Sequence, residues 1–205
     1  MSDNSLKDPY NIVITGVGGQ GNVMASKLLG NMLVGRGYYV TIGETFGASQ
    51  RGGSVMSHMR ISGKTVWSPQ IPEHKADLII AIEPVEGIRV LARYGNPAVK
   101  LLCNSHPVYP SSVIRGEIDY PSPEEIETSV RNLASDTIFI NATEKAVSLG
   151  NPILAGIVLL GTTCGTGVLP LNRKDFHETI VSRLADQQVK LNMKAFDMGF
   201  GLSKN

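Results

Sequence analysis

The sequence predicts an α/β fold with three layers, in which helices cover both faces of a mostly parallel, mixed sheet. Runs rich in Ile and Val alternate with segments whose apolar residues recur at helical spacing, a pattern typical of buried parallel strands and their covering helices. A glycine-rich turn at 16–21 joins the first such run to the first helix. An alternating stretch at 54–61 indicates an added antiparallel strand. We expect a single domain over all 205 residues, with a flexible N-terminus at 1–10.

The glycine turn and a helix lie between the first two predicted strands. Residues 11–15 form the first strand, a helix starts at Gln20 and ends near Gly35, and residues 38–42 form the second strand. A loop at 44–53 follows, because its glycines and polar residues cannot bury a continuous apolar face. The turn and the loop lie about thirty residues apart, which is the size of one βαβ unit. We therefore expect both to leave the carboxyl ends of neighbouring parallel strands and to share one surface.

The middle of the chain is predicted to continue the sheet. Residues 54–61 and 64–67 have the pattern of an antiparallel hairpin. Buried strands follow at 76–82 and 99–104, separated by a helix at 85–94.

The next part alternates irregular and regular segments. Residues 105–123 hold four prolines and are expected to be irregular. A helix is predicted at 123–134, a short strand at 137–140, and a short helix at 141–149.

The last part is predicted to be helical. The strongly apolar helix that begins at Pro152 carries small residues that permit close packing against a neighbour: Ala155, Gly156 and Gly161. Two amphipathic helices follow from Asn172, and Gly199 and Gly201 are expected to end the fold.

Composition argues against several function classes. Charged residues make up 18% of the chain and the net charge is +1, which gives no basis for a nucleic-acid surface or a membrane-surface protein. No apolar run approaches the ~20 residues of a membrane span, so we expect a cytoplasmic protein. The two cysteines, Cys103 and Cys164, are far apart and lie outside any CxxC, which predicts buried reduced thiols. The histidines lack metal-ligand spacing, and no metal site is expected: His58, His74, His106 and His177.

The turn at 16–21 matches GxGxxG directly after a strand and before a helix. Glycines there let backbone amides and the positive helix end approach a phosphate. The predicted ligand-contacting residues of this turn are Gly16, Gly18, Gly19, Gln20 and Gly21. The alternative is a tight strand-to-helix turn that serves packing alone. If the ligand is a nicotinamide dinucleotide, Glu44 lies at about the right distance to hold a ribose.

The loop GASQRGGS forms a second anion-compatible segment. Arg51 can bind phosphate or carboxylate with two hydrogen bonds, while glycines admit a close backbone approach and neutral side chains add hydrogen bonds. The predicted ligand-contacting residues are Gly47, Ser49, Gln50, Arg51, Gly52 and Gly53. The alternative is a solvated loop with a lone arginine.

Catalytic side chains are not predicted on this chain. It lacks a GxSxG elbow, a Walker lysine and an adjacent Cys/His pair. We expect it to be inactive alone.

Five blocks together resemble the gamma subunit, or fused gamma domain, of 2-oxoacid:ferredoxin oxidoreductases of the pyruvate and indolepyruvate type. The blocks are GVGGQGNVMASKLLG at 16–30, FGASQRGGSVMSHMRIS at 46–62, ADLIIAIEP at 76–84, NATEKAVSLGN at 141–151, and LGTTCGTGVLP with NMKAFDMG near the end. The combination of GxGGQG with RGG carries the resemblance; either half alone is less specific. A Rossmann-like fold is implied.

The resemblance implies a subunit of a complex that oxidatively decarboxylates a 2-oxoacid to an acyl-coenzyme A and reduces ferredoxin. Coenzyme A would contact this chain, whereas thiamine diphosphate and iron-sulfur clusters would belong to partner subunits, the thiamine-bearing alpha and beta type and the ferredoxin-like type. A homodimer is possible for the isolated chain. An aryl-pyruvate or a general oxoacid substrate both fit. Two other functions stay open: a stand-alone NAD-dependent oxidoreductase, and a subunit that only scaffolds its partners.

Overall fold

The computed structural model describes residues 6–47 and 53–203, and within them six strands form one sheet in the order β2-β3-β1-β4-β5-β6. The strands are β1 (Tyr10–Val17), β2 (Tyr39–Phe46), β3 (Ser54–Ser62), β4 (Leu78–Ala81), β5 (Lys100–Asn104) and β6 (Asp136–Ile140). The helices are α1 (Asn22–Gly35), α2 (Pro84–Tyr94), α3 (Ser111–Ile114), α4 (Pro123–Arg131), α5 (Ala142–Ser148), the 3-10 helix η1 (Pro152–Leu154), α6 (Ala155–Gly165), α7 (Arg173–Val181) and α8 (Asp186–Leu202).

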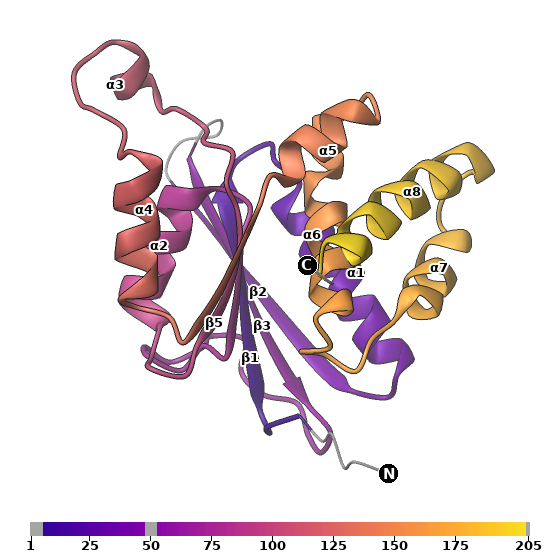
Figure 1. Ribbon diagram of the computed structural model, residues 1–205. Helices are drawn as coiled ribbons and strands as arrows, with labels where there is room; N and C mark the ends of the chain where they lie inside the picture. The colour runs from indigo at the N-terminus through magenta and orange to yellow at the C-terminus, as the bar shows by residue number, and fades with distance from the viewer. Residues whose placement is uncertain (1–5, 48–52, 204–205) are drawn as a thin grey trace.

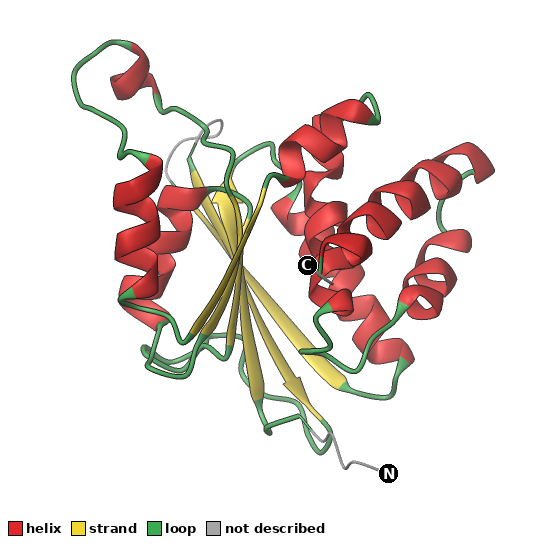
Figure 2. Cartoon of the chain, viewed as in Figure 1, coloured by secondary structure: helices red, strands yellow, loops and turns green. Residues whose placement is uncertain are grey.

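Helices cover both faces of the sheet, which confirms the predicted three-layer α/β class. Helices α2 and α4 lie on one face, and α1, α5, α6, α7 and α8 lie on the other (Figures 1 and 2). Strands β1, β4, β5 and β6 are parallel, while β3 runs antiparallel between β1 and β2. The sheet is mixed and mostly parallel, as expected.

The predicted hairpin between 54–61 and 64–67 is wrong. Strand β3 pairs with β2 on one side and with β1 on the other, so Met59 lies opposite both Ile42 and Ile12. Residues 64–67 form no strand and are exposed, and Arg60 of β3 contacts the end of this segment. The guanidinium of Arg60 lies 4.8 Å from the ring of Trp67 and donates to the carbonyl of Ser68 at 3.3 Å.

The position of β3 also corrects the expected strand neighbours. The first two strands of the chain, β1 and β2, are parallel but are not adjacent, since β3 lies between them. The glycine turn and the second loop therefore do not leave neighbouring strands. They still leave the same edge of the sheet.

Two apolar clusters form the core, one on each face. On β1, Ile12 and Ile14 point into the cluster with α1, α6 and α8, whereas Val13 points into the cluster with α2 and α4. Burial on both faces explains why β1 and β4 read as continuous apolar runs rather than as alternating ones.

Helix α6 is buried along almost its whole length and crosses α8 closely, which confirms the predicted close packing. A β-carbon at Gly161 would overlap the backbone carbonyl of Phe196, and one at Gly199 would overlap the carbonyl of Val158. Thr162 Oγ1 donates to the Gly199 carbonyl at 3.0 Å. Gly199 and Gly201 thus lie inside α8, and neither ends the fold as expected, because α8 continues to Leu202.

The Pro-rich segment 105–123 is irregular as expected, apart from the single turn of α3, and it extends beyond the carboxyl edge of the sheet (Figure 1). The other predicted elements agree with the structure to within a few residues. In the described part of the chain, each helix is too short or too polar to cross a membrane.

Replacing Gly199 with Ala is expected to lower the free energy of unfolding by about 1–3 kcal/mol, because the added methyl group forces α6 and α8 apart. Thermal or urea unfolding measures the change. The matched control is Gly201→Ala on the same helix, where an added β-carbon meets no atom within 4 Å. This control should be stabilised by about 0.4–1 kcal/mol. Equal stability of the two variants would refute the close contact.

Candidate functional site

The carboxyl edge of the sheet contains the topological switch point of the fold. From β1 the chain turns through α1 to β2 and β3 on one side, and then crosses to β4 on the other side. Strands β1 and β4 are paired up to a bond from the Ile82 amide to the Thr15 carbonyl, at 2.7 Å. Beyond this bond, the glycine turn leads into α1, and Glu83 leads into α2. Ligands of open α/β sheets bind at such a crevice.

The glycines of the turn serve different geometric needs. Gly19 and Gly21 have φ values of 99° and 84°, which strain any residue with a β-carbon. A β-carbon at Gly16 would lie 2.7 Å from both Gln20 Oε1 and Asn22 Oδ1. A side chain is therefore strained by the backbone at Gly19 and Gly21, and at Gly16 it would have to displace the side chains of Gln20 and Asn22.

Gln20 connects the two strands that border the crevice. Its Oε1 accepts from the Val17 amide at 2.7 Å, and its Nε2 donates to the Ile82 carbonyl at 3.2 Å. The same carbonyl accepts from Asn104 Nδ2 at 3.0 Å, and Asn104 also donates to Thr143 Oγ1 at 2.9 Å. A line of amides thus links the carboxyl ends of β1, β4 and β5 to α5.

The N-terminus of α1 lies directly at the turn. Gly21 is its N-cap residue, so α1 has no side-chain cap, and its first turn holds no acidic residue. Backbone N–H groups at such an end carry partial positive charge. Asn22 is buried and donates from Nδ2 to the Val17 carbonyl at 3.1 Å, while its Oδ1 has no hydrogen-bond partner among the described residues.

One described end of the second loop, at Gly53, lies against the glycine turn, and the other, at Gly47, is bound to Ser54. The Gly18 amide donates to the Gly53 carbonyl at 2.8 Å, and the Gly47 amide donates to the Ser54 carbonyl at 2.8 Å. The expectation that the two loops share one surface is confirmed at Gly53 alone. Four predicted site residues lie outside the described part of the chain: Ser49, Gln50, Arg51 and Gly52.

Two acidic residues at the start of α2 were not singled out from the sequence. Glu83 is 2% exposed and caps α2 by accepting from the Glu86 amide at 2.8 Å. Glu86 is also buried, and its carboxylate accepts from Ser54 Oγ at 2.6 Å and from Arg89 at 2.7 Å. The start of β3 is thereby tied to α2. The sequence E-P-x-E after a buried strand is a helix-start signal that could have identified both residues.

Glu44 does not occupy the position that a nicotinamide site requires. It lies within β2 opposite Ser57, and β3 separates β2 from β1. Two strand spacings amount to about 10 Å. Glu44 instead lines an open cavity of about 340 Å3 together with His58 and Arg93, on the face of the sheet that α2 covers in part.

The expectation of two buried thiols agrees with the structure, and one of the histidines is buried as well. His58 is buried, accepts from the Ile71 amide through Nδ1 at 3.3 Å, and has its pKa lowered by burial and by the nearby Arg93 charge. Both thiols are free and buried, and burial raises the pKa of Cys164 to about 12 and that of Cys103 further. The described residues contain no cluster of acidic, His and Cys side chains that could hold a metal ion.

Residues 11–202 match the family described as pyruvate ferredoxin/flavodoxin oxidoreductase. The chain belongs to this family. It is 40% identical to indolepyruvate oxidoreductase subunit IorB of Pyrococcus horikoshii over 95% of this chain and 96% of that subunit. It is 36% identical to the subunit of the same name from Thermococcus kodakarensis, again over 95% and 96% of the two chains. The chain is thus a gamma-type subunit of a 2-oxoacid:ferredoxin oxidoreductase.

Solved structures of the family have the same fold. The gamma subunit of a keto/oxoacid ferredoxin oxidoreductase from Geobacter sulfurreducens aligns with a TM-score of 0.66 at 23% identity, over 95% of this chain and 98% of that one. A 2-oxoglutarate:ferredoxin oxidoreductase from Magnetococcus marinus aligns with a TM-score of 0.74 at 18% identity, over 97% of this chain and 32% of that longer one. In that longer protein, the family fold is one part of a larger chain.

Within this family fold, Gln20 is expected to stabilise the switch point by hydrogen bonding to both β1 and the end of β4. Changing Gln20 to Glu keeps an acceptor for Val17 but turns a carboxylate toward the Ile82 carbonyl. The free energy of unfolding should fall by about 1–3 kcal/mol. Gln187→Glu on the exposed surface of α8 is the control and should change it little. Equal effects of the two changes would show that the bridge contributes nothing to stability.

Proposed function

We propose that this chain is the coenzyme A-contacting subunit of an oxidoreductase complex that oxidatively decarboxylates an aryl 2-oxoacid to an acyl-coenzyme A and reduces ferredoxin. Family membership supports the reaction class, and the relatives named as indolepyruvate oxidoreductase subunits favour an aryl substrate over a general oxoacid. Thiamine diphosphate and iron-sulfur clusters belong to the partner subunits in this proposal, and the complex is cytoplasmic.

The observation that carries the coenzyme A role is the open N-terminus of α1. The side chains of the chain itself cap α2, α4, α5 and α7: Glu83, Ser122, Asn141 and Asn172. Helices α3, α6 and α8 also lack a side-chain cap, but α1 begins within the glycine turn itself, at Gly21. The N–H groups of its first turn, which no capping side chain of the described residues binds, and the dipole of a helix of 14 residues favour an anion beside the glycine turn. A phosphate of coenzyme A has the chemistry that this end can bind.

Several predicted residues belong to this site in the proposal. The backbone at Gly16, Gly18, Gly19 and Gly21 would approach the phosphates, while Gln20 keeps the turn in place through its two internal bonds. Arg51, with Ser49, Gln50 and Gly52, lies in the segment that joins the described glycines Gly47 and Gly53. A hydrogen bond ties Gly53, the described residue that follows this segment, to Gly18 of the turn. The solved relative from Magnetococcus marinus holds coenzyme A, which supports the choice of coenzyme.

A scaffolding role has one observation in its favour. Met24 and Ile153 are 38% and 46% exposed and lie within 4 Å of the β-carbon position of Gly21. Exposed apolar side chains beside the turn suit a partner subunit. Stand-alone NAD-dependent oxidation is disfavoured, because β3 displaces Glu44 from the ribose position.

Changing Arg51 to Ala should weaken coenzyme A binding by about 1.5–3 kcal/mol, the value of a hydrogen bond to a charged group. Steady-state kinetics of the reconstituted complex should show this loss as a raised Michaelis constant for coenzyme A. Calorimetric titration of the complex with coenzyme A and with NAD should give heat of binding for coenzyme A alone.

The matched control is Arg183→Ala. Arg183 is exposed and borders a cavity with Val34 and Gly35 at the opposite end of α1 from the glycine turn. It should leave the Michaelis constant unchanged. An Arg51 variant that binds coenzyme A normally but fails to assemble would favour the scaffolding role, and hydride transfer to NAD by the chain would overturn the proposal.

A further inference from the structure

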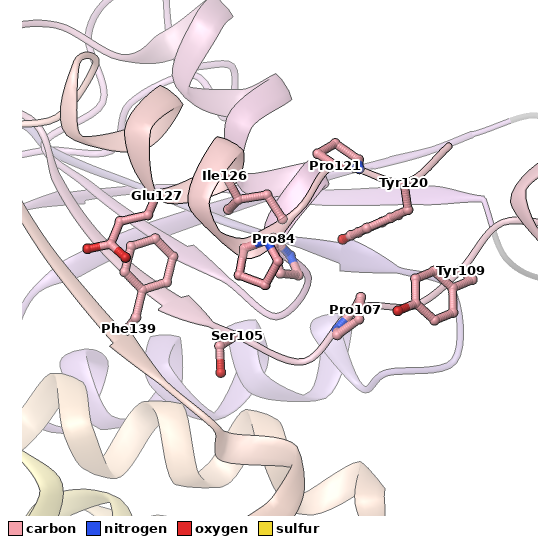
Figure 3. Close-up of a pocket in the computed structure, with 10 residues that line it drawn as sticks. Pro84, Ser105, Pro107, Tyr109, Tyr120, Pro121, Ile126, Glu127 and Phe139 are labelled. Atoms are coloured by element: carbon pink, nitrogen blue, oxygen red, sulfur yellow. The ribbon is translucent and has the colours of Figure 1, made fainter. Parts of the chain in front are cut away.

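A second cavity opens at the carboxyl edge of the sheet, on the far side of β4 from the glycine turn. It has a volume of about 200 Å3 and lies between the N-termini of α2 and α4, beneath the Pro-rich segment 105–123. Its lining residues are Pro84, Ser105, Pro107, Tyr109, Tyr120, Pro121, Pro123, Ile126, Glu127 and Phe139 (Figure 3). None of them belongs to the coenzyme A site proposed above.

Aromatic and proline rings form most of the wall. Figure 3 shows Tyr109 and Tyr120 on one side of Pro84, with Phe139 and Glu127 on the other side. The two tyrosine rings are packed edge to face, with centroids 5.1 Å apart. Proline rings are rigid, so a ligand would lose little free energy in ordering this part of the wall. The faces and edges of these rings suit a flat aromatic group.

The two helix ends beside the cavity do not attract an anion. Pro84 and Pro123 occupy the first position of α2 and α4 and have no N–H. Two positions further on, the Glu86 amide is bound by the Glu83 carboxylate, and the Glu125 amide is bound by the Ser122 hydroxyl at 3.2 Å. The cavity therefore suits an uncharged group, in contrast to the open end of α1.

Glu83 holds the cavity in its open shape. The buried carboxylate accepts from the hydroxyl of Tyr120 and from the amide of Val108. Burial and the bond to Glu83 raise the pKa of Tyr120. Because the hydroxyl is committed to Glu83, the ring of Tyr120 stays at the wall of the cavity. One carboxylate thus joins α2 to both ends of the Pro-rich segment.

Two hydrogen-bond acceptors complete the lining. Ser105 carries a hydroxyl, and its amide donates to the Ile140 carbonyl at 2.8 Å, which anchors it beside β6. Glu127 carries a carboxylate whose Oε1 accepts from Arg131 in the next turn of α4. Figure 3 shows the oxygens of both side chains turned away from Pro84, so they can accept from an N–H group on a ring edge that reaches the rim of the cavity.

We propose that this cavity binds one planar heteroaromatic ring that carries an N–H donor. The volume fits a ring rather than a whole coenzyme, since sites for drug-sized ligands measure about 300–1,000 Å3. Two sources share this chemistry: the base of a nucleotide coenzyme and the ring of an aryl 2-oxoacid. The proposal does not depend on an anion site at the glycine turn.

Titration of the full chain with indole and with adenosine tests the proposal, because neither probe carries a phosphate or a carboxylate. Saturation-transfer NMR and calorimetry should detect at least one probe with a dissociation constant at or below about 1 mM. Tighter binding of adenosine would point to the nucleotide source, and tighter binding of indole to the aryl source. Methylation of the indole nitrogen should weaken the binding of indole.

Tyr109→Ala should weaken binding by about tenfold, because the variant removes an aromatic wall. Tyr109 is 53% exposed, so the fold should tolerate the change. The matched control is Tyr39→Ala, which removes a tyrosine that is 49% exposed on the edge strand β2. This control should bind as the unchanged chain does. The proposal fails if neither probe binds, if 1-methylindole binds as tightly as indole, or if the two variants bind equally.

Discussion

The insertion of β3 between β1 and β2 is the constraint on which the carboxyl edge depends. Because β3 runs antiparallel to both neighbours, the chain that leaves β2 must return beside β1. Its return is fixed where the Gly18 amide binds the Gly53 carbonyl. Ser54 then reaches the carboxylate of Glu86 on α2. Two glycine-rich segments that are distant in sequence are thereby joined to each other and to the far side of the switch point.

The same edge separates two kinds of binding chemistry. At α1 the helix end is open, glycines leave the backbone exposed, and the interior amides of Gln20 and Asn104 keep β1, β4 and β5 together. At α2 and α4, prolines and capping side chains close the helix ends, and aromatic rings line the space between them. Membership of the oxidoreductase family supports coenzyme A as the proposed ligand of the open N-terminus of α1. The capped N-termini of α2 and α4 border a second cavity at the same edge, which is proposed to bind an uncharged ring.

Local sequence patterns predict most of the helices and strands, but they do not predict which strands and side chains contact one another. The apolar run of β1, the glycine turn and the helix after it were predicted, because each is encoded by adjacent residues. The pairing of β3 with β2 and β1 was missed, since register depends on contacts across the sheet. Gly199 was interpreted as a terminator by propensity, whereas contact with Val158 makes it a packing residue. Glu83 was overlooked because its partner Tyr120 lies 37 positions away.

Hydrogen-deuterium exchange of the assembled complex, with and without coenzyme A, tests the shared surface at the switch point most directly. Saturating coenzyme A should slow amide exchange at 16–24, where the glycine turn meets the open end of α1. Residues at the opposite end of the sheet should not respond. Unchanged exchange at 16–24 in a complex that is saturated with coenzyme A would contradict the account.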